Sequence, residues 1–276
     1  MATILAVSSF VARGTVGLRA IMPALDRMGH EVIAFPTTLL SNHLGHPRAD
    51  GAAVPPETLV AMFEAFDANG WLAKVDGIQT GYLPSPDHVR LVETMIERVR
   101  AVRPDALIVC DPVLGDHPGG LYVPKSVAHA VHDRLLPRAT HVKPNPFELA
   151  FLSDRTIETL ADVIEAARAL PPAIVLASSV HDGPERLANV IVTETRAGLC
   201  SVPRVRDVPL GTGDLLTALF TARALEGKDP LASAAFAAAG VAAAIAASSG
   251  HDELQLASPI EWHRAAPLSM VDLAAE

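Results

Sequence analysis

Short apolar, β-prone runs alternate with longer helical patterns along most of this chain, and this alternation constrains the fold more than any other feature. Continuous apolar strands between helices are typical of a mostly parallel sheet that helices cover on both faces. The expected strands are Thr3–Ser8, Glu31–Pro36, Gly77–Tyr82, Ala106–Cys110, His141–Val142, Ala173–Ala177, Ala188–Thr193 and Gly198–Val202. The expected helices are Gly17–Gly29, Pro55–Asn69, Pro86–Arg103, Pro124–Leu135, Pro146–Leu152, Thr156–Leu170, Thr212–Glu226 and Pro230–Ser249.

The last three expected strands lie too close together in the sequence to leave room for helices, so they predict an antiparallel region. The chain has 276 residues, of which 50% are hydrophobic, and this is enough for one large core. The sequence contains no evident repeat, low-complexity segment or linker. We therefore expect one α/β domain over residues 1–276, with a mostly parallel central sheet and an antiparallel edge region.

The net charge of −9 and the pI near 5.6 argue against nucleic acid or an anionic membrane as the main partner. A polyanionic substrate must then be met by local amides, cations or a metal ion. Cys110 and Cys200 are too few for a disulfide framework, which fits a reducing cytoplasm. The N-terminal segment lacks the basic residues of a signal peptide. The longest apolar tract, Ala234–Ala247, is too short to span a bilayer and predicts a buried helix.

The tetrapeptide Gly211-Thr212-Gly213-Asp214 precedes an apolar run that predicts a helix. Two glycines allow a sharp turn, and the free amides of the helix that follows form an anion site with the helix dipole. An aspartate there places a proton acceptor beside the anion, which suits phosphoryl transfer to an alcohol. The alternative is a loop in which Thr212 or Asp214 is an ordinary helix cap. The motif is neither a Walker A loop nor a dinucleotide fingerprint.

Polar side chains follow most of the expected strands at the point where each strand ends. In open α/β sheets, ligands bind outside the carboxyl ends of the strands. Because these ends meet at one edge, residues that are far apart in the sequence converge on one candidate site. They are Ser8 and Ser9, Thr80, Gly81 and Tyr82, Asp111 and Asp116, Asn145 and Glu148, and Ser178 and Ser179.

Two pairs of these residues have more than one interpretation. Asn145 and Glu148 lie three residues apart at the start of a helix, so their side chains share a face. This spacing fits oxygen ligands of a magnesium ion and equally fits a capping box. Asp111 and Asp116 could hold a metal or orient phosphates, or they could anchor the loop between them.

Six short segments make the chain resemble the pyridoxal kinase family of the ribokinase superfamily. The superfamily likeness depends mainly on Pro144–Glu148 and on Gly211–Asp214. The markers of the pyridoxal subgroup are Ser41-Asn42-His43, Gly81-Tyr82-Leu83, Cys110–Asp116 and Tyr122-Val123-Pro124. The resemblance implies a ribokinase-like three-layer α/β/α sandwich. It also implies ATP-dependent phosphorylation of the 5′-hydroxymethyl group of pyridoxal, and of pyridoxine and pyridoxamine, with Mg²⁺ as the divalent metal.

The resemblance also implies roles for the phosphate-binding residues. Asp214 is the expected base, and Gly211, Thr212 and Gly213 hold the charge on the transferred phosphoryl group. Because a helix N-terminus stabilises the ionised carboxylate, we expect Asp214 to be a weak base. Asn145 and Glu148 are the expected organisers of the metal and its waters. The expected nucleotide contacts are Asp111, Asp116, Tyr122, Ser178 and Ser179, and the segment 117–122 is the expected lid over ATP.

The expected vitamer contacts are Ser9, Thr38, His43 and Tyr82. Phe10 and Arg13 depart from the family pattern, in which a histidine and an aromatic residue are common, so vitamer preference stays open. The resemblance further implies a homodimer and leaves a monovalent cation requirement open. The alternatives are a kinase for another small alcohol, such as hydroxymethylpyrimidine, and a catalytically silent vitamer-binding protein. The tail after His251 resembles nothing that gives it a role.

Overall fold

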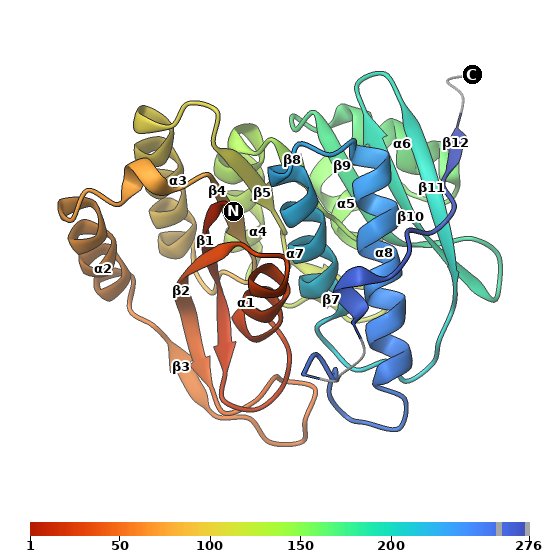
Figure 1. Cartoon of the computed structure of the whole chain (residues 1–276), viewed down its shortest axis with the longest axis horizontal. Coiled ribbons are helices and arrows are strands. Elements are labelled where there is room, and N and C mark those ends of the chain that lie inside the picture. The colour runs from red at the N-terminus through yellow and green to blue at the C-terminus, as the bar shows by residue number, and fades with distance from the viewer. Residues whose placement is uncertain (258–260, 274–276) are drawn as a thin grey trace.

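Strands from both ends of the chain join one ten-stranded sheet in the computed structural model, which describes residues 1–257 and 261–273 (Figure 1). The strand order is β12-β11-β10-β9-β8-β5-β4-β1-β2-β3. Pairings between β2 and β9 are parallel, whereas β3 and the β10–β12 side are antiparallel. The strands are β1 Thr3–Val11, β2 Glu31–Leu40, β3 Gly51–Ala53, β4 Gly77–Thr80, β5 Leu107–Cys110, β8 His141–Val142, β9 Ile174–His181, β10 Arg186–Thr193, β11 Ala197–Pro203 and β12 Val271–Leu273. The predicted parallel sheet with an antiparallel edge is confirmed.

Helices pack on both faces of this sheet, so the predicted three-layer α/β/α sandwich is confirmed (Figure 1). One layer contains α1 Leu18–Arg27, α7 Thr212–Leu225 and α8 Pro230–Ala247. The other contains α2 Pro56–Ala68, α3 Pro86–Val102, α4 Lys125–Ala130, α5 Pro146–Ser153 and α6 Leu160–Ala169. A π-helical turn, Val131–Leu135, continues α4.

Strand β1 shows why the central strands are apolar on both sides. Leu5 and Val7 belong to the core under α2–α6, while Ile4 and Ala6 belong to the core under α1, α7 and α8. Successive side chains of a strand point to opposite faces, so a strand between two helical layers has no face left for water. All four side chains are fully buried.

Helix α8 is long and apolar enough to cross a membrane by length and composition alone. In the described structure it packs against α7, β10 and β11. Its alanine-rich surface allows close approach, and a side chain at Gly240 would collide with Leu219 of α7. The prediction of a buried helix is confirmed.

The structure also has strands that the apolar runs did not predict. β1 and β2 continue past the expected ends through an irregularity between Ser8 and Phe10. Two short strands, β6 (Gly115–Asp116) and β7 (Gly120–Leu121), form a separate antiparallel pair. The tail that had no assigned role supplies β12 at the sheet edge, and it buries Trp262, whose indole N–H donates to the Leu256 carbonyl.

Candidate active site

The glycine turn before α7 lies against the loop that follows β1. Gly211 has φ +100°, and a side chain there would overlap the Thr15 carbonyl. It is the N-cap residue of α7, and no side chain caps the helix. The alternative interpretation of Thr212 or Asp214 as the cap is therefore wrong. The first amides of α7 stay available for an anion.

Asp214 instead accepts a hydrogen bond from another part of the chain. Its Oδ2 accepts from the amide of Gly17 at 2.9 Å, across 197 residues of sequence. Gly17 has φ +54°, and a side chain there would overlap Ser9. Ser9 occupies the irregularity in β1, a position where strands often re-aim a side chain next to a site. The structure thus brings the predicted Ser9 and Asp214 together around one glycine.

The expectation that Asp214 is a weak base is wrong in direction. Burial, with the nearby negative charge of Asp111, raises the pKa of Asp214 from 3.8 to about 6. The Gly17 amide and Lys143 oppose this shift but do not cancel it. A carboxylate with a pKa near the working pH is a better proton acceptor than an ordinary aspartate.

Lys143 is a charged residue of this site that the sequence reasoning missed. It follows β8 directly, and its Nζ lies 3.0 Å from Oδ2 of the predicted Asp111, with both side chains buried. The Thr217 hydroxyl donates to the same oxygen at 2.6 Å. Oδ1 of Asp111 is buried and has no hydrogen-bond partner among the described residues. A lysine at the carboxyl end of a buried strand is the pattern that could have revealed it.

Asn145 and Glu148 form a complete capping box at the start of α5. The Asn145 side chain accepts from the Glu148 amide, and Glu148 Oε2 accepts from the Asn145 amide, each at 2.9 Å. Glu148 Oε1 accepts from the amide of Leu114, and Asn145 Nδ2 donates to the Gly115 carbonyl. Burial raises the pKa of Glu148 to about 7. The capping alternative is confirmed, and the metal role stays a prediction.

The expected lid is the hairpin of β6 and β7. Asp116 pairs with Gly120 next to the turn of the hairpin, and burial, together with a hydrogen bond to this carboxylate, raises the pKa of Tyr122. A side chain at Gly115 would collide with the Gly120 carbonyl of the opposite strand. The Tyr122 side chain is 54% exposed, so its ring is free to meet a ligand.

A cavity of about 450 Å³ extends from the glycine turn into the space between α8 and the antiparallel strands. Thr212 and Gly213 form one end of it, together with the predicted Ser178 and Ser179. Ser179 has φ +58° at an irregularity in β9, which aims the serine pair out of the regular sheet. The remaining lining is mainly apolar and includes Leu187, Val202, Val208, Leu216, Val241 and Ala242.

Two other predicted vitamer contacts, Thr38 and Tyr82, lie on β2 and just after β4. The amide of Tyr82 donates to Ser8 Oγ at 3.2 Å, which holds the end of β4 beside β1. Thr38 lies on β2, and its buried hydroxyl has no hydrogen-bond partner among the described residues. An unpartnered buried hydroxyl fits a residue that contacts a ligand.

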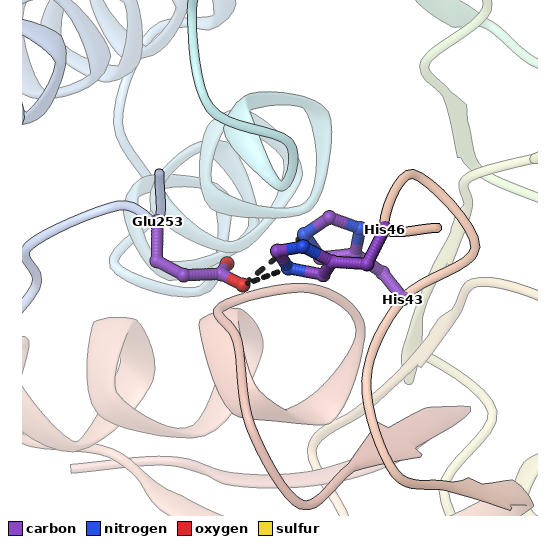
Figure 2. A group of neighbouring side chains, drawn as sticks. All are labelled: His43, His46 and Glu253. Carbon is purple, nitrogen blue, oxygen red and sulfur yellow. Dashed lines mark hydrogen bonds and ion pairs between the residues drawn. The ribbon is translucent and has the colours of Figure 1, made fainter. Parts of the chain in front are cut away.

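His43 lies in a cluster with His46 and Glu253 (Figure 2). The two rings stack with centroids 4.3 Å apart, and their Nε2 atoms lie 3.2 and 2.8 Å from Glu253 Oε1. The distances would suit a metal ion, but Arg13 already places a guanidinium 3.5 Å from this oxygen. The Gly45 amide donates to His43 Nδ1, which fixes the ring at the loop. The cluster therefore acts as a brace between the loop and the tail.

The cluster of His43, His46 and Glu253 is connected to the glycine turn through Thr15. Glu253 Oε2 accepts from the Thr15 amide at 3.3 Å, and the Thr15 carbonyl is the atom that packs against Gly211. The tail thus supports the loop that carries Gly17. The predicted contact between His43 and a vitamer stays a prediction.

Comparison with known proteins places this geometry in a family. The family described as Phosphomethylpyrimidine kinase matches residues 41–257. A pyridoxal kinase of Leifsonia xyli is 34% identical over 79% of this chain and 80% of its own length. A pyridoxine/pyridoxal/pyridoxamine kinase of Bordetella bronchiseptica is 34% identical over 93% of this chain and 94% of its own. The chain belongs to the pyridoxal kinase family. The resemblance inferred from the short motifs is confirmed.

The solved structures agree with this family. Pyridoxal kinase from Leishmania donovani, in complex with ADP and pyridoxamine, superimposes with a TM-score of 0.92 at 28% identity, covering 98% of this chain and 99% of its own. For this pyridoxal kinase family member, the individual residue roles remain predictions.

Proposed function

We propose that the chain transfers the γ-phosphoryl group of ATP to the 5′-hydroxyl of pyridoxal, and also of pyridoxine and pyridoxamine. The observation that carries this proposal is the position of Asp214, a buried carboxylate in the first turn of α7 beside free helix amides. The family relatives act on these vitamers, and the Leishmania donovani structure holds ADP and pyridoxamine.

In this reaction, Asp214 accepts the proton of the 5′-hydroxyl, and the hydroxyl oxygen of the vitamer bonds to the γ-phosphorus. The bond from that phosphorus to the bridging oxygen breaks, and ADP leaves. The amides at Gly211–Gly213 hold the charge on the transferred group, because helix N-termini bind anions. The Gly17 amide orients the carboxylate of Asp214, and the apolar cavity beside Ser178 and Ser179 receives the nucleoside of ATP.

The acidic residues near the glycine turn fit a magnesium ion that arrives with ATP. Carboxylate oxygens suit this ion, and Oδ1 of Asp111 is buried without a partner. Asp111, Asp116 and Glu148 would hold the ion or its waters, while Asn145 fixes Glu148 through the capping box. When bound, Mg²⁺ neutralises charge on the phosphates of ATP.

The direct test is formation of pyridoxal 5′-phosphate by the purified protein, with ATP and Mg²⁺ present or omitted. Product that requires both supports the proposal. The same assay with pyridoxine and pyridoxamine ranks the vitamers. Tight binding of vitamers without turnover would favour the silent binding protein instead.

A second candidate substrate is hydroxymethylpyrimidine, because the matching family is described as Phosphomethylpyrimidine kinase. The pyrimidine also carries a hydroxymethyl group, so Asp214 could serve it in the same way. The ratio of kcat/KM for pyridoxal and for hydroxymethylpyrimidine decides between the two. A higher value for the pyrimidine would replace the vitamer as the main substrate.

The raised pKa of Asp214 predicts the pH dependence of the reaction. Its pKa lies at about 6, so the carboxyl is protonated below that pH and cannot accept the substrate proton. We expect kcat/KM for pyridoxal to fall by about tenfold per pH unit below pH 6. A profile measured from pH 3 to 8 checks this. An acid limb near pH 4 would show that Asp214 titrates as an ordinary aspartate.

The cavity predicts a selective defect in ATP binding. Ala242 lines the cavity, so Ala242→Phe fills part of it. We expect the KM for ATP to rise at least about tenfold, while the KM for pyridoxal changes little. Ala246→Phe is the matched control, because Ala246 lies one turn further along α8 and is exposed. Equal effects of both variants would place the nucleoside elsewhere.

The homodimer and the cytoplasmic location implied by the resemblance belong to the same proposal. Both cysteines are free and buried, which fits a reducing compartment. Sedimentation of the purified protein tests the dimer, since a single species at twice the chain mass is expected.

A further inference from the structure

The edge that holds the glycine turn also holds a buried ion pair. Lys143 Nζ lies 3.0 Å from Asp111 Oδ2, and each side chain is less than a tenth exposed. A Cβ at Gly213 would lie 3.2 Å from the same Nζ, so the ammonium lies directly beside the turn. It therefore lies close to where a phosphoryl group would meet the amides of α7.

The charges around Lys143 are unbalanced. Asp111, Glu148 and Asp214 all influence the ammonium electrostatically, and Lys143 is the only cation that acts on all three carboxyls in the described structure. Buried carboxylates without a positive partner are costly, and they would repel an incoming phosphate. A fixed positive charge at this point counters both effects.

We propose that Lys143 is a built-in cation of this site. Its ammonium holds the Asp111 carboxylate in place and supplies positive charge behind the glycine turn, so turnover requires no added monovalent cation. The inference rests on the proposed kinase function. It also answers whether the reaction requires a monovalent cation, which the sequence left open.

The contacts of Asp111 explain why a separate monovalent ion is not needed. Its Oδ2 already receives the Lys143 ammonium and the Thr217 hydroxyl. The same Thr217 oxygen lies 3.0 Å from the Gly213 carbonyl, so one side chain contacts both Asp111 and the turn. A monovalent cation at Oδ2 would face the ammonium within a few ångströms, with no accompanying negative charge to offset the repulsion. Oδ1 is buried and has no hydrogen-bond partner among the described residues, so it is the oxygen left for the divalent ion that arrives with the negative charge of ATP.

The test separates charge from packing with two substitutions. Lys143→Ala removes the charge and opens space, whereas Lys143→Met removes the charge and keeps most of the volume. We expect both to lower kcat by about 10²-fold, the scale for losing one fixed electrostatic contact in a site. Added ammonium or potassium ions should raise the kcat of Lys143→Ala at least tenfold and should change the kcat of Lys143→Met little. Lys228→Met is the control, because Lys228 is exposed beyond the end of α7.

The native protein should show the complementary result. In buffers whose only monovalent cation is tetramethylammonium, its kcat should stay within twofold of the value in potassium. A native protein that loses activity without potassium would overturn the proposal. So would a Lys143→Ala variant with native kcat, or equal rescue of both variants, because a purely structural lysine predicts no dependence on added cations.

A readout without catalysis keeps this inference separate from the proposed function. Crystals of Lys143→Ala grown with Rb⁺ should show anomalous density where Nζ lay, and native crystals should show none there. If neither protein phosphorylates a vitamer but the ion binds, the kinase function fails and the cation assignment stands. If Lys143→Ala is too unstable to crystallise, a melting temperature that rises with Rb⁺ in Lys143→Ala but not in Lys143→Met gives the same answer. Absence of Rb⁺ dependence in both measurements would refute the inference.

Discussion

Asp214→Asn is expected to lower kcat for pyridoxal phosphorylation by at least about 10²-fold, the lower end for losing a general base. Asparagine keeps the shape of the side chain and can still accept the hydrogen bond from the Gly17 amide. It cannot take the proton of the 5′-hydroxyl. The KM values should change little, because the amides at the glycine turn and the apolar cavity remain. Steady-state kinetics with each substrate varied in turn measure both effects.

The control for this variant is the same substitution at an exposed aspartate. Asp133 lies in the π-helical turn after α4, and its side chain is 69% exposed. Asp133→Asn should therefore behave like the native protein. The acid limb near pH 6 should also disappear in Asp214→Asn, since the titrating group is gone. If Asp214→Asn keeps native kcat, the carboxylate only anchors Gly17, and another group must accept the proton.

Local patterns were sufficient to predict most of the fold. The runs Thr3–Ser8 and Ala106–Cys110 are apolar and short, and proline at the start of Pro146–Leu152 marks a helix end, so each pattern has a local cause. The strands that were not predicted have no such local pattern. β6 and β7 are two residues each, and β12 pairs with β11 from the far end of the chain. Such pairings depend on contacts between distant segments, which periodicity does not encode.

The site was predictable to the extent that it lies at the ends of strands. Asp111 and Asn145 were found because polar residues after apolar strands converge at one edge, and Asp214 was found from the glycine turn before a helix. Lys143 was missed although it has the same position, because lysine is mostly an exposed residue. Glu253 lies in a tail without a pattern and reaches Thr15 only in the folded chain. The pKa of Asp214 was mispredicted because burial and Asp111 outweigh the Gly17 hydrogen bond and Lys143, and these contacts form only in the folded chain.

Gly211→Ala is expected to be the most damaging single substitution at the turn. The backbone there has φ +100°, and the new methyl group would overlap the Thr15 carbonyl. The turn would have to move away from the loop that carries Gly17, which misplaces both the anion site and the hydrogen bond to Asp214. We expect kcat/KM to fall by more than about 10²-fold, since small displacements of a positioned group cost that much.

Gly227→Ala separates this collision from simple backbone strain. Gly227 lies just past the other end of α7 with φ +68°, and a side chain there would meet nothing within 4 Å. An alanine in this left-handed conformation costs about 1 kcal/mol of unfolding free energy, which denaturant titration can measure. Gly211→Ala should lose more stability than this because the overlap adds to the strain, and only Gly211→Ala should lose activity. Equal losses in both variants would mean that strain alone explains the effect, and the contact between Gly211 and Thr15 would then have no special role in holding the site.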